Sequence, residues 1–200
     1  MSPAPAPVVA DVGRAHLDRL RHALDLVEAH LPRVGRWGAV LHDRLAGGGR
    51  LLVAGNGGSA AQAQHLAAEL VGRYHDERPP FSAVALTADT STVTALANDY
   101  GVEELFARQV EAHGRPGDVL LCLSTSGRSP NVVRAADRAR ARGLETWALT
   151  GAPPSPLARA SVDAVAVGSD HTATVQEVHQ VLIHLLCEAF DARMRERSGG

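Results

Sequence analysis

Short, predominantly apolar runs alternate with longer amphipathic stretches through most of the chain. The apolar runs lie at 51–54, 82–86, 118–124, 145–150 and 163–167. Each has the length of a buried strand, and the sequence between them carries apolar residues at helical spacing. Strands that alternate with helices form right-handed crossovers, which build a parallel sheet covered on both faces. We therefore predict an α/β fold with a single five-stranded, doubly wound parallel sheet in the order 2-1-3-4-5.

The residues before the first apolar run predict helices. Apolar side chains from 8 to 31 recur at spacings of three to five, and a second amphipathic stretch follows Pro32. We interpret residues 1–7 as a flexible tail, 8–49 as an N-terminal helix pair and 50–197 as the α/β core of the same domain. The apolar face of the helix pair can form an oligomer surface or pack back onto its own sheet.

Further helices are expected between and after the strands, at 91–98, 103–112, 129–142 and 174–195. Ligands of doubly wound parallel sheets bind outside the carboxyl ends of the strands, so we expect the ligand-binding edge there. The switch point lies between the strands that end near Ala54 and Ser124.

Composition excludes several classes of protein. The chain has 200 residues, 45% of them hydrophobic, and a net charge of −2, which is typical of one globular domain without a nucleic-acid surface. No run approaches the roughly 18 apolar residues of a membrane span, and the N-terminus lacks the pattern of a secretory leader. We therefore expect a cytoplasmic protein with no membrane partner. Cys122 and Cys187 lie in apolar runs, as reduced, buried thiols do.

The first strand runs into a glycine-rich turn, Gly55-Asn56-Gly57-Gly58-Ser59, and then a helix. Glycines allow positive φ and a close approach of the backbone to a ligand, and Ser59 can cap the helix. The unpaired amides of a helix N-terminus attract an anion. The turn matches neither the dinucleotide nor the Walker pattern, so it predicts a phosphate site without a nucleotide. An ordinary α/β turn is the alternative.

A second polar turn follows the strand that ends near Ser124. The segment Ser124-Thr125-Ser126-Gly127-Arg128-Ser129 places four hydroxyls just before a helix that opens at Pro130. Hydroxyls at the carboxyl edge of a sheet donate well to phosphate oxygens. We favour phosphate binding over the alternative, an ordinary capping loop.

Two helices carry candidate metal or acid–base groups. His65 and Glu69 are four residues apart and so leave the same helix face. Gln176 and His184 share a face of the last helix but lie ~12 Å apart along it, so spacing alone does not bring them to one ion. A solvated His–Glu pair and an ordinary helix histidine are the alternatives.

Four segments in order carry a resemblance to a known family: AGNGGSAAQAQHLAAELVGRY, LANDYG, GDVLLCLSTSGRSPNV and VQEVHQVLIH. They resemble the sugar isomerase (SIS) domain and, within it, the phosphoheptose (sedoheptulose 7-phosphate) isomerases. The resemblance spans nearly the whole chain. It implies a homotetramer with zinc-containing active sites between subunits. The implied reaction converts sedoheptulose 7-phosphate to D-glycero-D-manno-heptose 7-phosphate, the first step of nucleotide-activated heptose biosynthesis.

The resemblance also implies site residues. The zinc ligands, for one Zn²⁺ per site, fall on His65, Glu69, Gln176 and His184, a set of N and O donors that suits this ion. We expect Glu69 and His184 to exchange the protons of an enediol mechanism, because burial can tune a carboxylate and an imidazole for that task. The implied substrate contacts are Asn56, Gly57, Gly58, Ser59, Glu69, Arg73, Asn98, Asp99, Ser124, Thr125, Ser126, Ser129 and Gln176.

Two binding proteins are alternatives to the enzyme. The DnaA-initiator-associating proteins share the glycine turn and the following helix, but lack the groups at the positions of Glu69 and His184. This chain has both, which favours the enzyme. A non-catalytic phosphosugar-binding regulator would need the phosphate cradle without the acid–base groups. Arg128 and the Ala173-Thr174 pair depart from the family pattern, and this bears on which sugar is bound.

Overall fold

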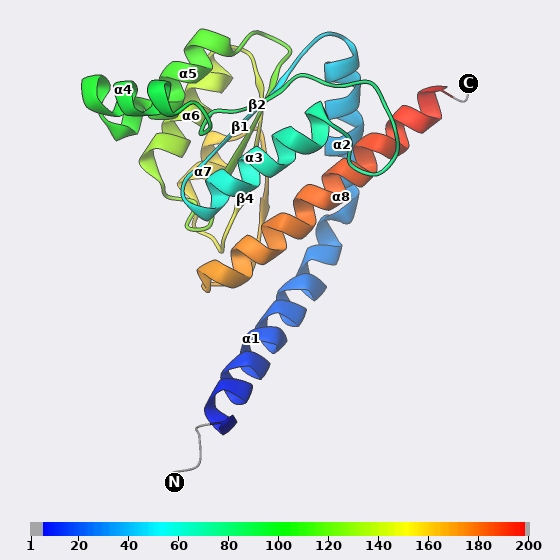
Figure 1. Cartoon of the computed structure of the whole chain (residues 1–200), viewed down its shortest axis with the longest axis vertical. Coiled ribbons are helices and arrows are strands. Elements are labelled where there is room, and N and C mark those ends of the chain that lie inside the picture. The colour runs from blue at the N-terminus through cyan, green and yellow to red at the C-terminus, as the bar shows by residue number, and fades with distance from the viewer. Residues whose placement is uncertain (1–5, 199–200) are drawn as a thin grey trace.

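A five-stranded parallel sheet forms the centre of the computed structural model, which describes residues 6–198 and the side chains of 10–197 (Figure 1). The strand order β2-β1-β3-β4-β5 confirms the predicted topology. Each strand lies within one residue of its predicted bounds. The strands are β1 (Leu51–Gly55), β2 (Ala83–Ala85), β3 (Val119–Ser124), β4 (Glu145–Thr150) and β5 (Asp163–Ala166).

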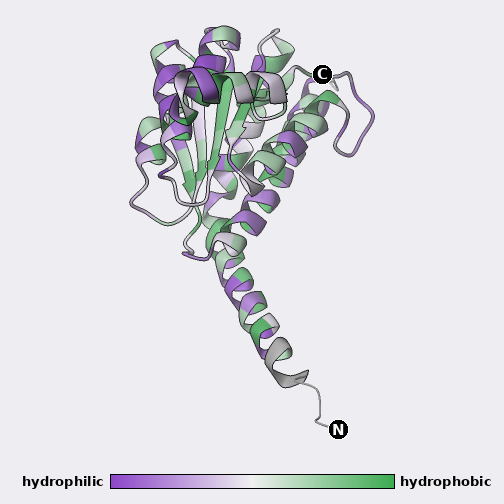
Figure 2. Ribbon diagram, turned by 60° about the vertical axis from the view of Figure 1, so that its left-hand side comes forward, coloured by the Kyte–Doolittle hydropathy of each residue, from purple (hydrophilic) through white to green (hydrophobic). Residues whose placement is uncertain are grey.

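Helices cover both faces of the sheet. Successive strand residues point to opposite faces, and both sets are apolar, so each face needs a cover of helices. Leu51 and Val53 join one apolar cluster with α1, α2, α3 and α8, whereas Leu52 and Ala54 join the other with α5, α6 and α7. Figure 2 shows the apolar strands between these layers. The helices are α1 (Ala6–Val27), α2 (Leu31–Ala46), α3 (Gly58–Val71), α4 (Thr90–Tyr100), α5 (Leu105–His113), α6 (Pro130–Ala141), α7 (Pro156–Ala160) and α8 (Thr172–Ser198), with 3-10 turns η1 (Glu28–His30) and η2 (Val102–Glu104).

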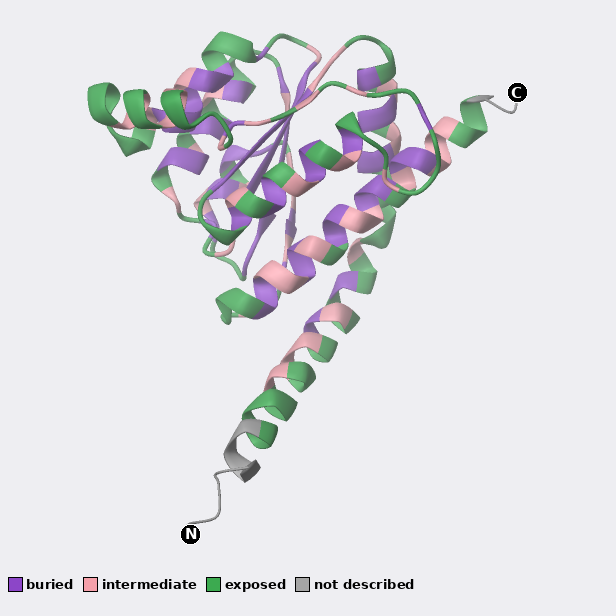
Figure 3. Ribbon diagram, in the orientation of Figure 1, coloured by how far each residue is buried: buried purple, intermediate pink, exposed green. Residues whose placement is uncertain are grey.

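The two N-terminal helices have different surroundings. Trp37 of α2 is buried, stacks on Trp147 of β4 with ring centroids 4.9 Å apart, and donates its indole N–H to Asp163. The first part of α1 instead projects away from the body and leaves Val12 and Leu17 exposed (Figure 3). Thus α2 packs on its own domain, and the outer part of α1 has no such cover.

Local chemistry corrects some boundaries. The helix α1 begins at Ala6, inside the predicted tail, and residues 1–5 of that tail lie outside the described residues. The proline-rich loop near 153–156 contains the short helix α7, because Pro156 occupies its first turn and the Ser155 hydroxyl accepts a hydrogen bond from Ala158 N at 3.0 Å. Sequence reasoning missed this helix.

The predicted cap of α3 was wrong. Gly57, with φ of 56°, occupies the N-cap position without a side-chain bond, and Ser59 is buried within the first turn. A positive φ favours glycine there, which leaves the serine two residues too late to cap.

The structure also bears on the cysteines and on membrane-spanning helices. Cys122 and Cys187 are free and buried as predicted, and burial raises the pKa of Cys187 to about 12. Within residues 6–198, none of the helices combines the length and apolar character that crossing a bilayer requires.

Candidate functional site

Helices α3 and α8 lie side by side and bring titratable side chains together (Figure 1). The Nε2 atom of His65 is 3.0 Å from Nε2 of His184 and 3.2 Å from Oε1 of Glu69. These three residues are called the groove triad below. His65 and His184 are 119 positions apart in the chain. Packing of the two helices therefore creates a constellation that neither helix pattern predicts alone.

The groove triad is partly shielded from solvent. The Glu69 side chain is 19% exposed and that of His65 is 41% exposed. The ring of Tyr74 lies beside His184, with centroids 5.7 Å apart, and burial raises the pKa of its phenol. These groups are therefore partly accessible, in surroundings drier than bulk water.

The contacts of His184 bear on whether a cation fits here. Its Nε2 atom faces His65 Nε2 and also Gln180 Nε2, each at 3.0 Å. An imidazole nitrogen offers one proton or one lone pair, so it cannot satisfy two neighbours in the same way. Two nitrogens bound to a tetrahedral zinc at ordinary bond lengths lie ~3.3 Å apart, close to the His65–His184 spacing.

The donors of the groove triad thus fit zinc in kind and in the spacing of the two imidazoles. Among the described residues, however, no group of three His, Cys, Asp or Glu side chains is already assembled as a metal site. Zinc binding stays a prediction.

Gln176 lies at the other end of α3. A Cβ on Gly58 would be 2.4 Å from Gln176 Nε2, so a side chain at this position would displace the amide. Gln62 donates to the Gln176 carbonyl at 2.7 Å, which holds this part of α8 in place. Gly58 and His65 are ~10 Å apart along the helix, so this arrangement does not bring the Gln176 amide to the groove triad. Its role as a ligand stays a prediction.

Hydroxyl groups converge at the carboxyl end of β3. Ser124 Oγ lies 3.2 Å from Ser129 Oγ and 3.4 Å from Ser126 Oγ, and Ser126 Oγ accepts from Arg128 N at 3.2 Å. Gly127 permits the turn with φ of 61°. Thr125 is half-buried in the same turn. The predicted clustering of hydroxyls is confirmed, and their capacity to bind phosphate stays a prediction.

The glycine turn after β1 is tied to this hydroxyl loop. Asn56 and Asn131 exchange two amide hydrogen bonds of 2.9 and 3.0 Å. Asn56, Ser129 and Asn131 line one cavity of about 260 Å³. Sequence reasoning did not single out Asn131 as a site residue, although it directly follows the hydroxyl loop and Pro130. We call the turn 56–58 together with the loop 124–129 the cradle.

Three predicted substrate contacts, Arg73, Asn98 and Asp99, are exposed and make local bonds in this chain. Arg73 follows α3, is 58% exposed at its side chain and donates to the His75 carbonyl. Asn98 donates to Asp99 at 2.8 Å on the exposed end of α4. These roles stay predictions.

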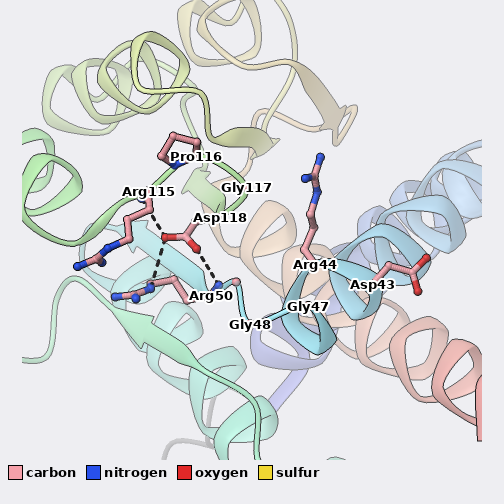
Figure 4. A pocket seen from close by; sticks show the side chains of 10 residues that line it. Asp43, Arg44, Gly47, Gly48, Arg50, Arg115, Pro116, Gly117 and Asp118 are labelled. Carbon is pink, nitrogen blue, oxygen red and sulfur yellow. Dashed lines mark hydrogen bonds and ion pairs between the residues drawn. The ribbon is translucent and has the colours of Figure 1, made fainter.

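A different cleft, of about 340 Å³, lies at the opposite edge of the sheet (Figure 4). Asp118 accepts from Arg50 N at 2.9 Å and Arg115 N at 3.0 Å, which ties the start of β1 to that of β3. The side chains of Arg44 and Arg115 point away from each other. Because α/β sheets bind ligands at their carboxyl edge, we place the candidate site at the cradle and the groove.

Known proteins similar to this chain share its length and fold. Residues 17–151 match the family model of the SIS domain. A phosphoheptose isomerase from Streptomyces coelicolor is 60% identical over 185 residues, which are 92% of this chain and 80% of that protein. The solved phosphoheptose isomerase of Neisseria gonorrhoeae has a TM-score of 0.85 and 39% identity, with 92% of this chain and 100% of that one covered. That of Francisella tularensis has a TM-score of 0.86 and 35% identity, with 92% and 99% covered.

Proposed function

The chain belongs to the SIS-domain phosphoheptose isomerases, and we propose that it interconverts sedoheptulose 7-phosphate and D-glycero-D-manno-heptose 7-phosphate. Its relatives favour an isomerase over a binding module. The observation that carries the proposal is the groove triad, where one carboxylate and two imidazoles meet across α3 and α8. A module that only binds phosphosugars has no need of such a group.

The spacing of cradle and groove supports an elongated substrate. The cradle includes the N-terminal end of α3, and His65 lies ~10 Å further along this helix. An extended seven-carbon sugar phosphate can place its phosphate against Ser124, Ser126 and Ser129 while C1 and C2 reach the groove triad. Phosphate binding then supplies remote binding energy that positions the reacting carbons.

The reaction moves one proton between adjacent carbons and another between their oxygens. Glu69 and His184 are the pair that exchanges these protons, because a carboxylate and an imidazole can each accept a proton and return it. His65, Glu69 and His184 would hold zinc, and Gln176 would join them as a fourth ligand once its amide turns away from Gly58. Bound Zn²⁺ would supply a Lewis acid that polarises the sugar carbonyl. His65 also orients the groove triad, since its Nε2 contacts both other members.

We further propose a tetramer in which neighbouring subunits complete each site. Two observations support it: α1 projects with Val12 63% and Leu17 49% exposed, and the predicted substrate contacts Arg73 and Asn98 are exposed, where a neighbouring copy can reach them. Light scattering on the eluting protein should give four times the 21.0 kDa chain mass. A monomer at micromolar concentration would contradict this assembly.

The function is tested with purified protein of known metal content and sedoheptulose 7-phosphate. We expect an aldose 7-phosphate product, loss of its formation with a chelator, and recovery on adding zinc. Folded, zinc-loaded protein that forms no product would contradict the seven-carbon substrate. Product formation that a chelator leaves unchanged would contradict the zinc site but not the isomerase activity.

A further inference from the structure

A buried ion pair joins α3 to α8 beyond the groove triad. Arg78, in the loop after α3, donates from Nε to Oδ1 of Asp191 on α8 at 3.1 Å. Their side chains are 1% and 2% exposed. The guanidinium also lies 5.5 Å from the ring centre of Phe81 and 5.4 Å from that of Phe190, which shields the pair from water.

The remaining donors of Arg78 hold the end of α3. Nη2 donates to the backbone carbonyl of Glu69 at 2.6 Å, and Nη1 donates to that of Leu70 at 3.0 Å. The last carbonyls of a helix lack partners within the helix, so this guanidinium caps α3. One of the two carbonyls belongs to Glu69, a member of the groove triad.

Asp191 lies on the same helix as His184, seven residues further on. Seven residues are two helical turns, so both side chains leave the same face of α8, ~10 Å apart. The planar guanidinium of Arg78 therefore connects, through its hydrogen bonds, the backbone of Glu69 to the helix that carries His184.

We propose that the Arg78–Asp191 pair is a positioning device for the reaction, which sets the register of α3 against α8 and so the separation of Glu69 from His184. This inference rests on the proposed function. A slip of about 1 Å between reacting groups can lower a rate by about a hundredfold. The two residues act through Glu69 and His184, because neither reaches the groove itself.

Stability alone does not account for this pair. Replacing a buried ion pair by apolar side chains is often neutral or stabilising. Here Asp191 Oδ2 is also buried, without a hydrogen-bond partner among the described residues, which adds a desolvation cost. Apolar side chains could therefore replace the ion pair itself at little cost, whereas a fixed register requires the directional bonds of the guanidinium.

The test compares the full-length protein with the double variant Arg78→Met/Asp191→Leu, which removes both charges without leaving one unpaired. We expect a lower Tm, because the backbone carbonyls of Glu69 and Leu70 lose their donor. At a temperature where the variant is folded, kcat should be lower by about ten- to a hundredfold, with the KM for sedoheptulose 7-phosphate within about threefold. Zinc affinity, measured by chelator competition, should fall by about tenfold or more. A purely structural role would lower Tm but leave kcat and zinc affinity of the folded variant unchanged.

The chain offers a matched control in Arg195→Met. Arg195 pairs with Asp76 at 2.8 Å and joins the same loop to the same helix, but both side chains are about half exposed. Its removal should change neither kcat nor zinc affinity. A loss equal to that of the double variant would overturn the proposal.

A second variant, Asp191→Asn, tests the inference if the double variant does not fold. It keeps the shape of the side chain and weakens the bond to Arg78, so kcat should fall while KM is retained. Wild-type kcat in folded Asp191→Asn would overturn the proposal. If the wild type itself has no isomerase activity, the proposed function fails, and zinc affinity in the same variants still decides whether the pair positions the groove triad.

Discussion

The cradle and the groove triad sit at different points along α3 and are built in different ways. The cradle consists of hydroxyls and glycine backbone from two short loops, and Ser124, Ser126 and Ser129 lie within six positions of one another. The groove triad consists of titratable groups, and its two histidines are 119 positions apart. Hydroxyls can hold an anion without changing charge, whereas the groove can exchange protons. We infer that the molecule separates binding from chemistry along one helix.

The largest effect should follow from Glu69→Gln. The amide cannot accept a proton, so kcat should fall by about 10²- to 10⁴-fold. Binding of sedoheptulose 7-phosphate, measured by calorimetry, should remain within a few fold, because the cradle is intact. Retained turnover would remove Glu69 from the catalytic pair, and lost binding would break the separation of cradle from groove.

A smaller effect, on KM instead of kcat, is expected from Ser126→Ala. Loss of one hydrogen bond to a charged phosphate costs about 1.5–3 kcal/mol, so KM should rise by about tenfold or more while kcat stays near the wild-type value. Steady-state kinetics measure both constants. Ser161→Ala is the control, because the Ser161 hydroxyl bonds to the Leu157 carbonyl within α7. An unchanged KM for Ser126→Ala would argue against the cradle.

The smallest effect on activity concerns His179, which connects α8 to the sheet. Its Nε2 donates to the Thr150 carbonyl at 3.2 Å, and burial lowers its pKa to about 4. An unfolded histidine takes up a proton near pH 6.5, but the folded one does so only near pH 4. Stability should therefore fall by about 3 kcal/mol as pH drops from 6.5 to 4.

Urea unfolding across this range measures the loss. His179→Gln lacks the titrating group and should show a shallower dependence on pH. Equal slopes for the two proteins would contradict the assignment, and isomerase activity at pH 7 should change less than in Glu69→Gln.

Features of the fold that depend on short segments could be predicted from local sequence patterns. The strands, their order and both turns of the cradle could be predicted, because each depends on apolar runs, glycine and hydroxyl residues close in sequence. The cap of α3 was misplaced, since Gly57 rather than Ser59 takes the required backbone angle. The helix α7 was missed because prolines at 153–156 resemble a loop.

Contacts between distant segments could not be predicted from spacing. His65 and His184 were paired only through the family resemblance, and Gln180 and Arg78 gave no signal in the sequence. Their partners are set by how α8 lies against α3, which depends on the whole core. Arg73 and Asn98 remain predictions because their bonds in this chain are local ones on the surface.

The most direct test of proton transfer in the groove is isomerisation of sedoheptulose 7-phosphate in D₂O, followed by NMR of the aldose product. An enediol mechanism predicts deuterium at C2 of the product with the wild-type protein. The Glu69→Gln variant should bind the sugar and give neither product nor exchange at C1. Aldose formed with only protium at C2, or exchange that persists in Glu69→Gln, would contradict the account.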